Sequence, residues 1–93
     1  MPTYLMLTNL TAEGLRTLKN NPTRVTEVNQ EVEQMGGKVV TQYATLGEYD
    51  FVTVIEAPDE KTMAKISVEL GSRGTMTSQT LAAMSTDDLT GSL

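Results

Sequence analysis

Three side chains around one turn could take part in binding or chemistry. Asp50 could serve as a general base or acid, or could hold a ligand by a hydrogen bond. The hydroxyls of Tyr43 and Tyr49 could line a cleft. Each residue also has a structural interpretation: an Asp beside a turn commonly caps backbone N–H groups, and a Tyr can bury its ring in an interface while its hydroxyl stays in water.

A second set of candidates lies at the start of the last predicted strand. Arg73 would suit a carboxylate ligand if its side chain turns inward, because guanidinium groups bind carboxylates well. Thr75 and Thr77 could line a polar cavity nearby. Alternatively, Arg73 could interact with a helix dipole, and the Thr residues could be present for their strand propensity.

The sequence lacks the usual equipment of an active site. The chain has no His and no Cys, which removes the commonest general base, the commonest metal ligand and thiolate chemistry. We find no carboxylate pair, metal-ligand cluster, phosphate-binding loop or nucleophile elbow. We therefore expect no metal and no cofactor. Whether the protein is an enzyme stays open at this point, with a non-enzymatic role favoured.

Charge and composition exclude further classes. The 93 residues carry a net charge of -5, and the seven basic residues are scattered from Arg16 to Arg73, which argues against nucleic-acid binding. The apolar run at the N-terminus follows no basic segment and is too short for a signal peptide or a membrane span. We expect a cytoplasmic location and no membrane partner. One domain is predicted over residues 1–93, with 85–93 as a tail that could fray.

Helix signals are clear in two regions. Thr11 is a plausible N-cap for a short helical turn, and Asn21 followed by Pro22 predicts a further helix start. Apolar residues then recur at helical spacing as far as Met35, so either one kinked helix or two helices in tandem would fit. The second region is 60–70, where Asp59 is the expected N-cap and Gly71 the expected terminator.

Strand patterns separate these helices. We predict strands over 3–8, 38–44, 49–56 and 75–82, with a hairpin loop at 45–48 whose Gly47 can adopt positive φ. In the second strand, alternation places Val39, Thr41 and Tyr43 on one face. One helical turn is possible at 85–89.

The order β-α-β-β-α-β predicts a ferredoxin-like α+β fold: a four-stranded antiparallel sheet with both helices on one face. The third strand carries apolar groups on both faces, with Phe51 and Ile55 on one and Val52 and Val54 on the other. Helices can cover only one of those faces. Because monomers rarely expose a large apolar patch, we predict that a second copy covers the other, which gives a homodimer or a higher homo-oligomer.

The segment 46–50, Leu-Gly-Glu-Tyr-Asp, followed by a strand resembles the signature of the GYD domain family. Supporting features are Tyr4 in the opening strand, Gly36-Gly37-Lys38-Val39 at the exit into the second strand, Tyr43 before the hairpin, and polar Thr residues after Gly74. The resemblance extends from about Thr3 to Leu89. It implies the dimeric α+β barrel arrangement of a small bacterial protein and carries no settled activity with it.

Three functions remain compatible with these observations. The first, which we favour, is an oligomeric module that binds a small molecule in a cleft between the sheet and its partner subunit. The second is a cofactor-independent enzyme of isomerase or monooxygenase type that uses Asp50 or a Tyr. The third is a purely structural or interaction subunit. For ligand binding we select the following residues: Tyr43, Tyr49, Asp50, Arg73, Thr75 and Thr77.

Overall fold

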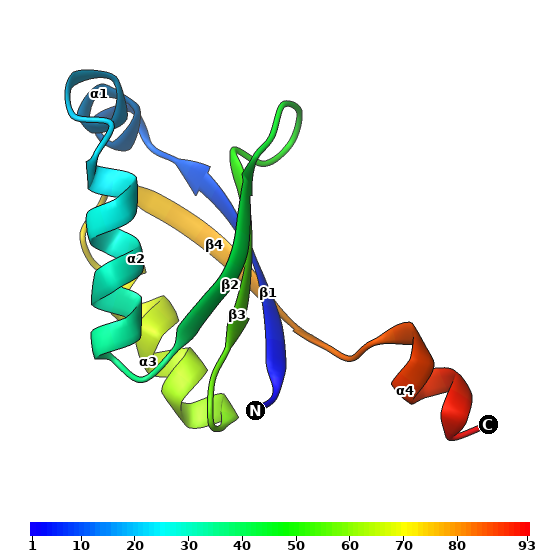
Figure 1. Ribbon diagram of the computed structural model, residues 1–93. Coiled ribbons are helices and arrows are strands. Elements are labelled where there is room, and N and C mark those ends of the chain that lie inside the picture. The colour runs from blue at the N-terminus through cyan, green and yellow to red at the C-terminus, as the bar shows by residue number, and fades with distance from the viewer.

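The computed structural model describes all 93 residues and contains four strands and four helices (Figure 1). Their order along the chain is β1, α1, α2, β2, β3, α3, β4, α4. Their bounds are Thr3–Leu10 for β1, Ala12–Asn20 for α1, Arg24–Gln34 for α2, Lys38–Ala44 for β2, Phe51–Glu56 for β3, Glu60–Gly71 for α3, Met76–Ala83 for β4 and Thr86–Gly91 for α4.

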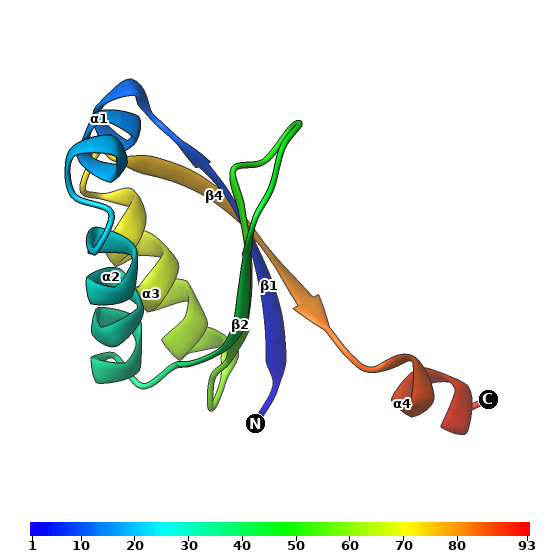
Figure 2. The same ribbon diagram turned by 45° about the horizontal axis from the view of Figure 1, so that its top comes forward.

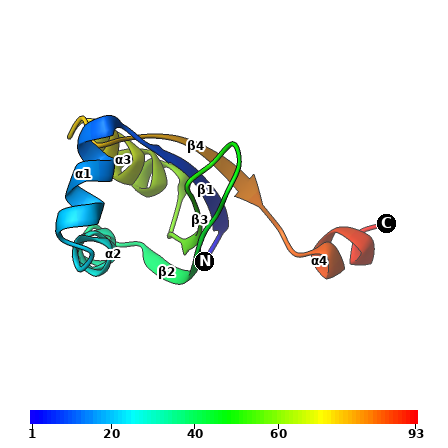
Figure 3. The same cartoon turned by 90° about the horizontal axis from the view of Figure 1, so that it is seen from above.

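The four strands form one sheet in the order β2-β3-β1-β4, and every neighbouring pair is antiparallel. Figure 2 shows α2 and α3 running along the same face of this sheet, and Figure 3 shows α1 on that side as well. The two β-α-β units thus cross over on one side, as right-handed connections require. The predicted ferredoxin-like α+β fold is confirmed.

The core lies between the sheet and the helices. Along β1, alternate residues Tyr4, Met6 and Thr8 are buried toward the helices, while their neighbours point the other way. Ile55 from β3 and Ile66 from α3 complete the centre of this layer. Alternation in the strands therefore decides which side chains meet the helices and which form the opposite face.

Side-chain caps fix the starts of α1 and α3. The Thr11 hydroxyl accepts the N–H of Gly14 at 3.2 Å, and Asp59 Oδ1 accepts the N–H of Thr62 at 2.8 Å, so both predicted N-caps are confirmed. The prediction for the end of α3 was wrong in detail. Helix α3 includes Gly71, and the glycine with left-handed φ in the following turn is Gly74.

The prediction of a helix start at Asn21 and Pro22 was wrong, although two helices in tandem are observed. Asn21 ends α1 by donating its N–H to the carbonyl of Thr17 at 2.8 Å. Pro22 lies in the turn that follows, and α2 begins only at Arg24. A turn that contains Pro uses the same residue types as a helix with Pro at its first position. This explains why the predicted start of the helix was two residues too early.

A β-bulge changes the faces of β2. Val39 pairs with Ile55 and faces the helices, but the register shifts at Val40, so that Thr41 is opposite Val54 on the other face. The predicted grouping of Val39 with Thr41 and Tyr43 was therefore wrong for Val39. One extra residue in a strand reverses the alternation beyond it, and simple period-2 counting does not detect this.

The hairpin between β2 and β3 is longer than predicted. The loop covers 45–50, closed by a bond of 2.8 Å from the N–H of Thr45 to the carbonyl of Asp50, and β3 begins at Phe51 instead of Tyr49. Gly47 has φ of 109°, as the turn prediction required.

Candidate functional site

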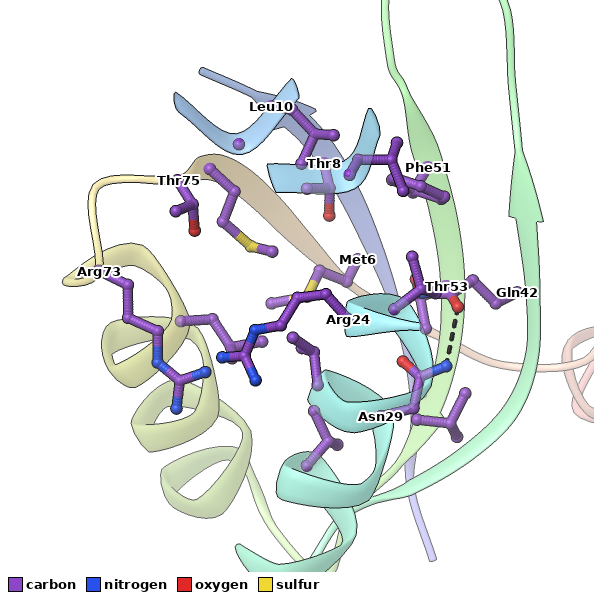
Figure 4. Close-up of a pocket in the computed structure, with 18 of the residues that line it drawn as sticks. Met6, Thr8, Leu10, Arg24, Asn29, Gln42, Phe51, Thr53, Arg73 and Thr75 are labelled. Carbon is purple, nitrogen blue, oxygen red and sulfur yellow. Dashed lines mark hydrogen bonds between the residues drawn. The ribbon is translucent and has the colours of Figure 1, made fainter. Parts of the chain in front are cut away.

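A cavity of about 180 Å³ lies between the sheet and the helices on the side of α1 and α2 (Figure 4). This volume is about ten times that needed for one water molecule. Its wall is mainly apolar and comes from every element except α4. The apolar side chains are Met6, Leu10, Leu18, Val25, Val28, Val32, Val39, Phe51, Ile55, Leu70 and Met76.

Uncharged polar groups line one side of this cavity. Asn29 Nδ2 donates to Gln42 Oε1 at 2.9 Å, and Gln42 Nε2 donates to Thr53 Oγ1 at 2.9 Å. This relay joins α2 to β2 and β3. Thr8 is 3% exposed, yet its hydroxyl takes part in none of the side-chain hydrogen bonds. Every fully enclosed side-chain oxygen has a hydrogen-bond partner, so the Thr8 oxygen, which has none, is not fully enclosed. It faces the cavity, as Figure 4 shows.

Two arginines line the cavity, and no acidic side chain does. Arg24 at the start of α2 and Arg73 after α3 both bond to the carboxylate of Glu31: Arg24 Nη1 lies 3.2 Å from Oε1, and Arg73 Nη1 contacts Oε2. The hydrogen bond from Arg73 holds the pKa of Glu31 below its ordinary value, and the same bond raises the pKa of Arg73. This ion-pair group connects α2 to the segment that leads into β4.

The opposite face of the sheet has no helix over it. We call it the open face and define it by Leu5, Leu7, Val52, Val54 and Leu81. The strand registers place Leu5 between Val54 and Leu81, and Leu7 beside Val52. Tyr43, opposite Val52, is 62% exposed at its margin. The prediction that apolar groups occupy both faces of the sheet is thus correct.

The C-terminal helix α4 projects beyond β4 toward the side of the open face (Figures 1 and 3). Ser85 caps it by accepting the N–H of Asp88 at 3.0 Å, but none of its residues is buried. Leu89 is exposed, and Leu93 after the helix is 96% exposed. An isolated helix of six residues is not stable in water without packing.

The residues selected from the sequence do not form one site. Arg73 and Thr75 line the cavity, whereas Tyr43 and Thr77 belong to the open face. The cavity also contains groups that the sequence analysis did not select, namely Thr8, Arg24, Asn29, Gln42 and Thr53.

Asp50 and Tyr49 both have partners within the chain. Asp50 Oδ2 accepts the N–H of Leu10 at 2.8 Å, and the N–H of Asp50 donates to the carbonyl of Thr8 at 2.8 Å, so this carboxylate extends the pairing of β1 with the hairpin. The hydroxyl of Tyr49 donates to Gln79 Oε1 at 3.1 Å, which places its ring over the β4 side of the open face.

Comparison with known families identifies the chain. The profile of the GYD domain matches residues 4–93, which is nearly the whole sequence. The chain belongs to the GYD domain family. The signature at 46–50 forms the end of the β2–β3 hairpin, where Gly47 supplies the positive φ and Asp50 the cap. The resemblance noted from the sequence is therefore confirmed.

A curated relative from Thermus thermophilus is 50% identical over 90 residues, covering 96% of this chain and 95% of the relative. It is named glutamine synthetase and cystathionine beta-lyase binding protein. Among solved structures, TTHA0845 from the same organism has a TM-score of 0.58 at 20% identity and covers 91% of this GYD domain chain and 95% of its own. FFRP-DM1 has a TM-score of 0.60 at 22% identity, with 90% and 100% covered. At these identities the two structures support the fold alone.

Two further features complete the description of this GYD domain. None of its helices is both long and apolar enough to pass through a membrane. No three side chains of the His, Cys, Asp or Glu type gather where they could hold a metal ion.

Proposed function

We propose that this GYD domain protein is a homodimeric protein-binding module that associates with enzymes of amino-acid metabolism. The observation that carries the proposal is the 50% identity, over almost the full length of both chains, to the Thermus protein named for binding glutamine synthetase and cystathionine beta-lyase. At that level of identity the surface of the two proteins should be similar enough to share partners of the same kind.

Self-association is the part of the proposal supported by geometry. The open face brings Leu5, Leu7, Val52 and Val54 together on one side of the sheet, where no helix covers them. Water contact with such a patch is unfavourable, and a second copy packed face to face would remove it. A C2 interface of this kind is self-complementary, because the same patch lies on both subunits.

The helix α4 supports the same arrangement. It extends on the side of the open face, so in a face-to-face pair each α4 would reach over the other subunit. Exposed Met84, Leu89 and Leu93 would then have an apolar surface to contact. Packing of this kind would supply the stability that a six-residue helix lacks by itself.

The enzyme-binding part is tested with purified components. The chain is mixed at about 10 µM, a concentration that populates complexes of micromolar affinity, with glutamine synthetase or cystathionine beta-lyase from its own source organism. We expect co-elution with at least one of them in size-exclusion chromatography. An unrelated dehydrogenase from that organism is the control. Elution apart from both enzymes would contradict the proposal.

Small-molecule binding is a second candidate function, and one observation favours it. The cavity of about 180 Å³ combines an apolar wall with two arginines and the Thr8 hydroxyl, which faces the cavity and has no partner within the chain, and this is the usual composition of a ligand site. It lies under the helices of one subunit and not at the subunit boundary, where we predicted a cleft from the sequence. Saturable binding of a small molecule, with NMR chemical-shift changes confined to cavity residues, would support this candidate.

A further inference from the structure

We propose that the cavity binds a small monocarboxylic acid that has an apolar body and a second, uncharged polar group, as in a branched-chain 2-oxo acid. The inference rests on the second candidate function above and specifies the class of its ligand.

The charges at the cavity wall favour a carboxylate. Arg24 and Arg73 are the only ionisable side chains that line it. Arg73 is held by Glu31 and Glu69, so the free donors belong to Arg24. Arg24 bonds to Glu31 through Nη1 alone, and its Nη2 and Nε hydrogens have no acceptor within the chain. A carboxylate can accept two parallel hydrogen bonds from such a fork. Glu27 lies 3.8 Å from Arg24, but its side chain is about half exposed, so water screens its charge.

The position of Arg24 supports a role beyond helix stability. It is the first residue of α2, and a positive charge at a helix N-terminus opposes the helix dipole. In Figure 4 its side chain extends toward Arg73. Its ion pairs with Glu27 and Glu31 offset this cost and leave the Nη2 and Nε hydrogens free to bind an anion.

The remaining wall specifies the rest of the ligand. Met6, Leu10 and Phe51 offer apolar contact to a short hydrocarbon body. The Thr8 hydroxyl, which faces the cavity and has no partner within the chain, can donate or accept one hydrogen bond. A plain hydrocarbon in the cavity would cover this hydroxyl and leave it unpaired, which costs free energy, so a ligand with a keto or hydroxyl oxygen is favoured.

The test is a titration of the full chain, labelled with ¹⁵N, followed by ¹H–¹⁵N correlation spectra. The probes are 4-methyl-2-oxopentanoate and its neutral amide, each added to about 10 mM to cover millimolar affinities. We expect saturable shifts at cavity residues with the acid, and binding of the amide weaker by about tenfold or more.

Three variants identify the contacts. Arg24→Gln should weaken binding of the acid by about tenfold or more, since it removes a charge-assisted pair. Thr8→Val keeps the side-chain shape and breaks no hydrogen bond of the chain, and it should weaken binding severalfold. Arg16→Gln is the matched control, because Arg16 is exposed on α1 and does not line the cavity. It should bind the acid as the wild type does.

Each outcome decides the proposal. Equal binding of acid and amide, or an Arg24→Gln variant with wild-type affinity, would overturn the carboxylate class while leaving small-molecule binding in place. If neither probe gives saturable shifts at cavity residues, both the ligand class and the second candidate function are contradicted. Spectra of the variants that match the wild type outside the cavity show that the fold is retained.

Discussion

Substitution of Gly14 by Ala should destabilise the protein even though Ala is the better helix former. A Cβ built on Gly14 lies 2.1 Å from the carbonyl oxygen of Thr75, which is backbone and cannot rotate away. That oxygen accepts a hydrogen bond from the N–H of Thr11 at 3.0 Å, and the Thr11 hydroxyl donates to the carbonyl oxygen of Gly74 at 2.8 Å. The added methyl group would therefore push apart the start of α1 and the start of β4.

The expected magnitude is the difference of two effects. Overpacking costs about 1–3 kcal/mol, and the loss of one hydrogen bond costs about 1 kcal/mol. Ala in place of Gly gains up to about 1 kcal/mol of helix propensity. We expect a net loss of about 2 kcal/mol, which lowers Tm by about 8–16 °C in a domain of this size.

Gly71→Ala is the matched control. Gly71 is also helical, its φ is not positive, and nothing lies within 4 Å of the added Cβ. This variant should be as stable as the wild type or more stable, by up to about 1 kcal/mol. Both variants are compared by thermal unfolding at one protein concentration, because self-association makes Tm depend on concentration. A Gly14→Ala protein at least as stable as the wild type would refute the reasoning.

Three further predictions concern charge, the hairpin and the open face. The folded-state pKa of Glu31 is lowered from 4.5, so the ionised carboxylate contributes fully to the free energy of unfolding above that pH. This contribution is lost as the pH falls through the lower folded-state pKa. In urea unfolding, the wild type should therefore lose more stability than Glu31→Gln between neutral pH and about pH 3, by up to about 1 kcal/mol. Equal losses of stability in the two proteins would contradict this prediction. Asp50→Ala leaves the Leu10 N–H without its acceptor and should cost about 1–3 kcal/mol with faster hydrogen exchange at that amide, whereas Asp50→Asn keeps an acceptor and should cost less; an unchanged exchange rate in Asp50→Ala would argue against the cap. Leu81→Lys, on the open face, should yield monomers in light scattering, while Val68→Lys, 71% exposed on α3, should stay associated; dimers of both variants would remove the open face as the interface.

Local signals in the sequence were sufficient for the fold. Thr11 and Asp59 are caps because short oxygen-bearing side chains satisfy free N–H groups, and that chemistry depends only on residues three positions away. Apolar side chains on both faces of β3 likewise predicted the open face. The prediction failed at Asn21 because a turn and a helix start use the same residue types. It failed at the bulge of Val40 because that outcome depends on how β2 pairs with β3.

The cavity could not be predicted, because its polar groups come from segments far apart in sequence. Asn29 has no partner nearby in the sequence, and only the packing of α2 on β2 brings it to Gln42. The bulge decides that Gln42 points to the helices at all. Arg24 gave one local signal: a cation at the first position of a helix is unfavourable and so calls for a reason.

The most direct test of this account is native mass spectrometry of freshly purified wild-type protein at micromolar concentration. We predict a mass of two chains of 10.1 kDa each, or of a larger even number of chains, because the open face of each sheet requires a cover. A spectrum that contains only the 10.1 kDa monomer would contradict the proposed homodimer.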